Sequence, residues 1–152
     1  MLFSRTCEHA IRAILYVAAS ADDGPVPVRS IAHTLDLPFA ALAKIIQTLC
    51  RRKLLVSHKG PGGGVTLARS AEAVTLQQVV EVIDGSELSK ECVMGVPGCS
   101  EDKAHCPLHE SWGKIRKQIL GMLGDRSIAS FARDLQGPGV ASIRLGRGGS
   151  DA

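Results

Sequence analysis

The glycine-rich run at residues 60–64, Gly-Pro-Gly-Gly-Gly, constrains the fold most, because it excludes both a helix and the interior of a strand. It separates two short apolar stretches, 54–59 and 65–68, which the sequence predicts to be strands joined by this turn. A nucleotide-binding loop is excluded, because no Gly-Lys-Ser or Gly-Lys-Thr follows and the next stretch is a strand instead of a helix. A hairpin without any ligand contact remains an alternative, since glycine turns also serve purely conformational purposes.

Two short helices are predicted immediately before this hairpin. Apolar residues at helical spacing indicate one helix over Val28 to Leu35 and a second from Pro38 to about Lys53. Two helices joined by a short turn and followed by a glycine-rich hairpin are typical of a winged helix-turn-helix, whose second helix enters the DNA major groove. The apolar face of the second helix carries Leu42, Ile45, Ile46 and Leu49, and its polar, basic face carries Lys44, Gln47, Thr48, Arg51 and Arg52.

A core helix within the first 21 residues and another helix from 73 to 83, ended by Gly85, complete a predicted DNA-binding domain over residues 1–85. The predicted fold class is therefore mainly α with a small β wing. Cys7 and Cys50 are predicted to be buried as small apolar residues. The inner face predicted for the first helix consists of Ile11, Ile14, Leu15 and Ala18.

Charge is divided unevenly along the chain. Residues 1–70 hold nine Lys and Arg against four Asp and Glu, whereas residues 71–152 hold nine against eleven. A basic N-terminal half fits double-stranded DNA, although charge alone also fits an acidic protein surface. The residues predicted to contact DNA are Arg29, Ala40, Ala41, Lys44, Gln47, Thr48 and Arg51 on the helices and His58, Lys59, Gly60, Gly62 and Gly63 on the wing.

Three equally spaced cysteines, Cys92, Cys99 and Cys106, followed by His109, form a candidate metal site. Glycine and proline residues between them exclude a regular helix, so residues 86–109 are predicted to form a loop around a metal centre. Thiolates are soft donors and favour an iron–sulfur cluster or zinc. Zinc and a metal-free thiol switch remain alternatives, although structural zinc sites normally contain closer cysteine pairs. A cysteine–histidine enzyme is disfavoured, because no third orienting group accompanies the pair, and no small-molecule substrate is expected.

A long helix is predicted after this loop, with Cys106 as its N-cap and Pro107 as its first residue. The partial positive charge of a helix N-terminus would then favour the thiolate form of Cys106. Residues 110–135 are predicted to be this dimerisation helix and a short helix after it, and residues 136–152 a disordered tail.

The long helix carries an apolar seam, which predicts a homodimer because the rest of the chain already fills one core. The predicted opposite side of this helix is polar. No apolar run in the sequence approaches the ~20 residues that a membrane-spanning helix needs, so a cytoplasmic location is expected. The seam consists of Trp112, Ile115, Ile119 and Met122, and the opposite side of Lys114, Arg116, Lys117 and Gln118.

Over residues 1 to about 135 the chain resembles the IscR/NsrR/RirA-type iron–sulfur regulators. The resemblance lies in residues 6–19 and 24–28, the 60–64 wing with the strand after it, residues 79–85, and the three-cysteine loop before a long helix. It implies a homodimeric winged-helix repressor or activator whose DNA affinity depends on an iron–sulfur cluster that senses oxygen, nitric oxide or iron.

The resemblance also implies the cluster ligands, which would be the three cysteines and a fourth, variable residue. His109 stands where IscR-like members have a histidine, and this favours a 2Fe-2S cluster. Glu8 stands where NsrR-like members supply a carboxylate from the partner subunit to a 4Fe-4S cluster, so it is the alternative. The cysteine gaps are slightly wider than in IscR itself, and Ala43 replaces a glutamate that in IscR-like members bears on DNA sequence choice.

Overall fold

Helix α1 (Arg5–Ala19) lies at the centre of the fold, in contact with α3 (Phe39–Arg51), α4 (Leu76–Asp84) and α7 (Ile128–Leu135). The structure, a computed structural model, describes residues 2–135. The inner face predicted for α1 consists of four residues, and Ile14 alone is fully buried; the others are Ile11, Leu15 and Ala18. The other three are half-buried, because α1 has neighbours on more than one side and packs through smaller residues. The buried residues of α1 are Cys7, Ala10, Ala13, Ile14 and Val17.

The helix-turn-helix prediction is confirmed. Helix α2 (Val28–Leu35) has the predicted bounds, and Asp36 ends it in the left-handed conformation, with φ of 51°. Pro38 stands at the cap of α3, just outside the helix instead of in its first turn. The apolar face predicted for α3, consisting of Leu42, Ile45, Ile46 and Leu49, is buried.

Helix α3 ends at Arg51, two residues before its predicted end. The backbone N–H groups of Lys53 and Leu54 donate hydrogen bonds of 2.9 Å to the carbonyls of Cys50 and Leu49, respectively. This pair of bonds is the Schellman motif, in which the residue with positive φ is normally glycine. Here that residue is Lys53, with φ of 58°.

The predicted wing is formed by β1 (Leu55–His58) and β2 (Gly64–Leu67), which pair antiparallel. A Cβ on Gly63 would lie 2.4 Å from the carbonyl oxygen of the residue that ends β1, so no side chain fits there. Val26, which precedes α2, exchanges backbone hydrogen bonds of 2.9 Å with Val65 of β2. The wing is therefore attached to the chain segment that enters the helix-turn-helix.

Helix α4 begins at Leu76, three residues later than predicted, because Thr75 and Gln78 form a capping box there. A short 3-10 turn, η2 (Ala71–Ala73), precedes this cap. The helix ends before Gly85, which has φ of 80°, as predicted.

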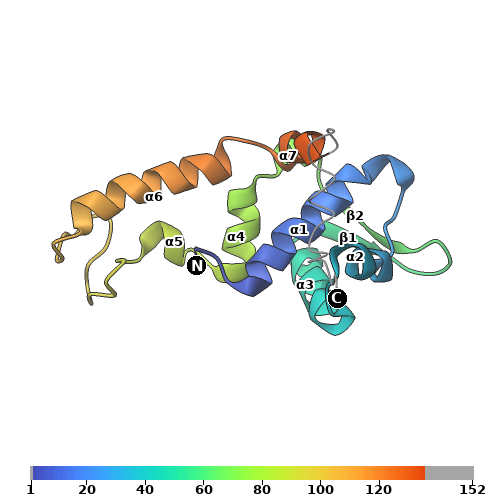
Figure 1. Ribbon diagram of the computed structural model, residues 1–152, viewed down its shortest axis with the longest axis horizontal. Helices are drawn as coiled ribbons and strands as arrows, with labels where there is room; N and C mark the ends of the chain where they lie inside the picture. The colour runs from blue at the N-terminus through green and yellow to red at the C-terminus, as the bar shows by residue number, and fades with distance from the viewer. Residues whose placement is uncertain (1, 136–152) are drawn as a thin grey trace, which may run out of the picture.

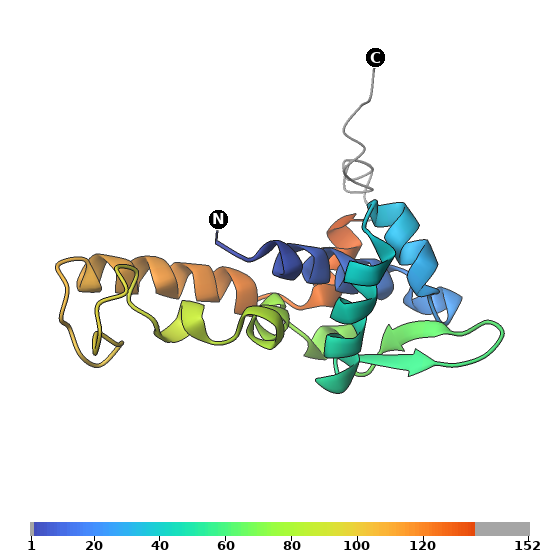
Figure 2. The same cartoon turned by 90° about the horizontal axis from the view of Figure 1, so that it is seen from below.

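Helix α6 (His109–Gly124) extends away from the winged domain, and α7 returns the chain to α1 (Figure 1). The short helix α5 (Glu87–Lys90) contacts α6, and the cysteine loop lies at the end of α6 that is remote from α7 (Figures 1 and 2). The predicted tail at 136–152 lies outside the described residues. Within residues 2–135 no helix is both long and apolar enough to cross a membrane.

Candidate metal centre and DNA interface

The side chains of Cys92, Cys99 and Cys106 meet at the remote end of α6. Their three sulfur atoms all lie within 4.8 Å of one another, and the Sγ atoms of Cys92 and Cys106 are 3.5 Å apart. The Nδ1 atom of His109 is 3.6 Å from the Sγ of Cys99, which is buried. The loop thus brings together three thiols and one imidazole, a donor set that suits iron–sulfur clusters and zinc.

Two of these thiols differ in acidity. The pKa of Cys92 is lowered to about 7, chiefly because backbone N–H groups at Val96 and Met94 bond to its sulfur. The pKa of Cys106 is raised, first by burial and then by the neighbouring thiols. The expectation that a helix N-terminus favours the Cys106 thiolate is therefore wrong, because α6 begins at His109 with the residue before it as cap, and Cys106 lies in the preceding turn.

Helix α6 contacts both ends of the cysteine loop. At the start of the loop, the indole Nε1 of Trp112 donates a 3.1 Å hydrogen bond to the carbonyl of Glu91, the residue before Cys92. The Nη2 atom of Arg116 lies 3.5 Å from the same carbonyl oxygen, and its guanidinium is 5.8 Å from the centre of the Trp112 ring. At the end of the loop, His109 is itself the first residue of α6.

Helical spacing places Arg116 on the polar, outward side of α6, and this prediction is wrong. Its side chain is 95% removed from solvent, because it folds over Trp112 towards the loop. The predicted dimer seam of α6 is only partly exposed to solvent. Ile115 is 48% exposed and Met122 57% exposed. Trp112 and Ile119 are half-buried. Glu8 lies half-buried on α1, which packs against α4 and α7, whereas the cysteine loop lies at the far end of α6 (Figures 1 and 2).

The residues predicted to contact DNA lie on α2, α3 and the wing, mostly exposed. The guanidinium of Arg29 stacks 4.7 Å over the ring of Phe39, at the start of α3. Thr48 is half-buried and accepts a 3.2 Å hydrogen bond from Arg51, and His58 contacts the hydroxyl of Thr66 across the wing at 2.8 Å. The exposed members of the set are Arg29, Ala40, Ala41, Lys44, Gln47, Arg51, His58, Lys59, Gly60 and Gly62.

The family model of the Rrf2 iron-dependent transcriptional regulators matches residues 3–134. The chain belongs to the Rrf2 family. Its homologues are transcriptional regulators and not enzymes, as the sequence predicts, and the predicted winged-helix class and IscR-type resemblance are confirmed.

Relatives of this Rrf2 chain include an HTH-type transcriptional regulator of Aquifex aeolicus, 32% identical over 78% of this chain and 83% of that protein. The regulator IscR of Yersinia enterocolitica is 29% identical over 83% of this chain and 76% of its own length. Among solved structures, T. potens IscR has a TM-score of 0.70 and 25% identity, covering 88% of this chain and 87% of that one. CymR, the global cysteine regulator of B. subtilis, has a TM-score of 0.75 at 21% identity, covering 87% and 96%, and supports the fold.

Proposed function

We propose that this Rrf2 regulator is a homodimer whose affinity for operator DNA is controlled by an iron–sulfur cluster held by Cys92, Cys99 and Cys106. The observation that carries the proposal is the convergence of the three sulfur atoms within 4.8 Å, beside an imidazole, in a family of iron-dependent regulators. A bound cluster would supply a centre that reacts with oxygen or nitric oxide or reports iron supply. Thiolates and imidazole both ligate such clusters, so the donor set fits.

His109 is favoured as the fourth ligand, and with it a 2Fe-2S cluster. Its Nδ1 already lies 3.6 Å from the Sγ of Cys99, whereas Glu8 lies on α1, away from the loop of its own chain (Figures 1 and 2). Glu8 would have to come from the partner subunit. His109→Ala should change the visible spectrum of the reconstituted protein while Glu8→Gln leaves it unchanged, and the reverse result would favour a 4Fe-4S cluster with Glu8.

The contacts of α6 suggest how the site acts on DNA binding. Trp112 and His109 connect α6 to the two ends of the loop, so ordering the loop would also fix the first turn of α6. The exposed Ile115 and Met122 on the same helix are the proposed dimer contacts. A change in the loop would therefore alter the packing between the two subunits and the separation of their α3 helices, which must match about one turn of DNA, ~34 Å.

A second candidate is a winged-helix regulator with zinc or a thiol switch at the same cysteines. It is favoured by the compactness of the site, because three sulfur atoms within 4.8 Å could surround one tetrahedral metal as they stand. Metal analysis distinguishes the two candidates.

The test is anaerobic purification followed by iron, acid-labile sulfide and zinc determination, with DNA binding measured before and after metal removal. We expect iron and sulfide in the native protein, their loss in Cys99→Ala, and their retention in the matched control Cys50→Ala. Protein that contains zinc without sulfide would support the second candidate. Equal DNA affinity with and without iron would contradict control by a cluster.

A further inference from the structure

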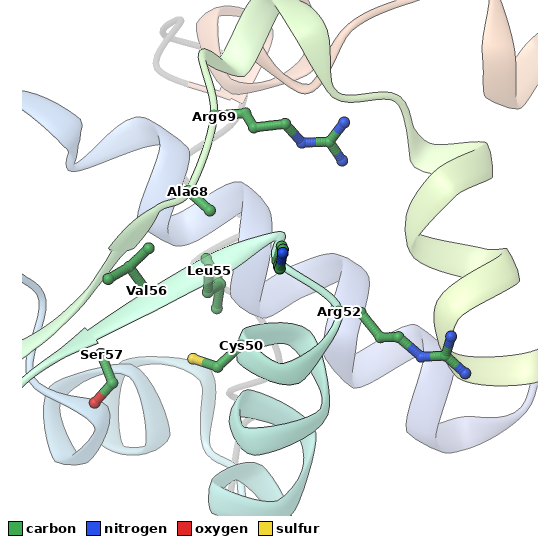
Figure 3. Close-up of a pocket in the computed structure, with 8 residues that line it drawn as sticks. Cys50, Arg52, Leu55, Val56, Ser57, Ala68 and Arg69 are labelled. Atoms are coloured by element: carbon green, nitrogen blue, oxygen red, sulfur yellow. The ribbon is translucent and has the colours of Figure 1, made fainter.

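A cleft of about 680 Å³ lies where the C-terminal end of α3 meets the wing strands (Figure 3). Its walls include Leu55, Val56 and Ala68 of the wing, and three cations stand around it: Arg52, Lys53 and Arg69. No acidic residue of the described range 2–135 lines it. Figure 3 shows Arg52 and Arg69 extending from two sides of the cleft in the same direction, towards α4.

The three cations have no partner within the described chain. Ion pairs elsewhere in residues 2–135 include Lys114 with Glu110 and Arg126 with Asp134. The side chains of the cleft cations make no hydrogen bond or ion pair there, and all three are exposed. A cleft with three unneutralised positive charges attracts an anion.

Lys53 adds a separate observation. It occupies the glycine position of the Schellman motif with φ of 58°, a conformation that disfavours residues with a Cβ. Glycine would close the same turn without strain. The sequence therefore keeps a positive charge beside the cleft at a conformational cost.

The position of the cleft indicates which anion it takes. It lies between the end of α3, next to Arg51 of the predicted DNA face, and the start of the wing. A helix in the major groove and a hairpin beside it flank the sugar–phosphate strand that separates the two grooves. We propose that the cleft binds a backbone phosphate of this strand through Arg52, Lys53 and Arg69. This inference rests on the proposed DNA binding, and it adds Lys53 and Arg69 to the predicted interface.

The test uses the full chain and a fluorescent duplex of random sequence, because phosphate contacts do not depend on sequence. Affinity is measured by anisotropy over a series of salt concentrations. Arg52→Ala and Arg69→Ala should each reduce the slope of log affinity against log salt by about 0.9, and the double variant by about twice that. Lys117→Ala, an exposed cation on α6, is the matched control and should leave the slope unchanged.

Lys53→Gly separates a phosphate contact from a structural role. It should reduce the slope by about 0.9 as well and raise the thermal unfolding midpoint, because glycine relieves the left-handed turn. A merely structural residue would show higher stability with an unchanged slope.

The outcomes are distinguishable. If Arg51→Ala on α3 lowers the slope and the cleft variants do not, the cleft inference is overturned and DNA binding by α3 stands. If the wild-type chain shows no salt-dependent binding of the duplex, the proposed function fails with it. If inorganic phosphate at fixed ionic strength raises the unfolding midpoint of the wild type but not of the double variant, while their DNA slopes agree, the cleft is a free-phosphate site and the backbone assignment is wrong.

Discussion

The indole Nε1 of Trp112 lies 3.1 Å from the carbonyl oxygen of Glu91, so the one tryptophan of the chain holds the residue that precedes the first cysteine of the loop. The bond joins two segments 21 residues apart. It connects Trp112, a residue of the α6 seam, to the start of the cysteine loop.

Trp112→Phe removes this bond and keeps an aromatic ring for the buried Arg116. We expect metal affinity to fall by roughly 10–100-fold, as it does when groups that orient metal ligands are lost. Cobalt(II) titration of the metal-free protein, followed by its visible absorption, measures the change. Gln118→Ala, at an exposed position on the same helix, is the control, and equal affinities in the two variants would show that the bond does not position Cys92.

Cys92 and Cys106 should react differently in reduced, metal-free protein. With a pKa of about 7, Cys92 is half ionised near neutrality, whereas the raised pKa of Cys106 keeps it protonated. Even after allowing for the lower nucleophilicity of an acidic thiol, iodoacetamide should label Cys92 roughly five times faster or more at pH 7. Labelling at Cys92 should level off above pH 7 while that at Cys106 keeps rising. Mass spectrometry of the labelled peptides checks both, and equal rates would contradict the assignment.

Cys7 should make stability depend on alkaline pH. Burial, assisted by Asp84, raises its pKa from 9.0 to about 12. Above pH 9 the unfolded chain releases this proton and the folded chain does not, so stability falls between pH 9 and 12, by about 1.4 kcal/mol per pH unit. Urea unfolding at pH 8 and pH 10 should show the wild type losing about 1.4 kcal/mol relative to Cys7→Ala. A constant difference between the two proteins would refute the shift.

Two neighbouring glycines in the wing should respond differently to alanine. Gly62 has φ of 73° and open space where a Cβ would lie, so Gly62→Ala should cost about 1–2 kcal/mol from conformation alone. Gly63→Ala puts a Cβ against two backbone carbonyl oxygens, at 2.4 and 2.8 Å, and the turn cannot close. We expect Gly63→Ala to lose duplex affinity while circular dichroism shows the helices intact. Equal affinity of the two variants would mean that the wing does not contact DNA.

Local signals predicted the helix-turn-helix and the wing well. Helix α2 has both predicted bounds, because the proline-containing turn before it and Asp-Leu-Pro after it are strong local signals. Helical spacing extends α3 two residues too far, since nothing in the sequence shows that Lys53 adopts positive φ. The same spacing starts α4 too early, because the capping box at Thr75 outweighs the apolar residue before it.

Contacts between distant segments could not be predicted in the same way. The convergence of the cysteines follows from one loop, so their spacing predicted it. The burial of Arg116 depends on Trp112 and on a carbonyl 25 residues earlier, and helical spacing alone assigns such a charge to solvent. The cleft at the base of the wing likewise combines Lys53 and Arg69, which no local motif connects.

The length of α6 has a mechanical consequence. Its 16 residues span about 24 Å, with the thiols at one end and the return to α1 through α7 at the other. A tilt of about 5° at the α7 end would displace the far end by roughly 2 Å, given that length. Under the proposed function, a loop displacement of that size would thus reach α7 and α1 as a small rotation, and not as a large translation.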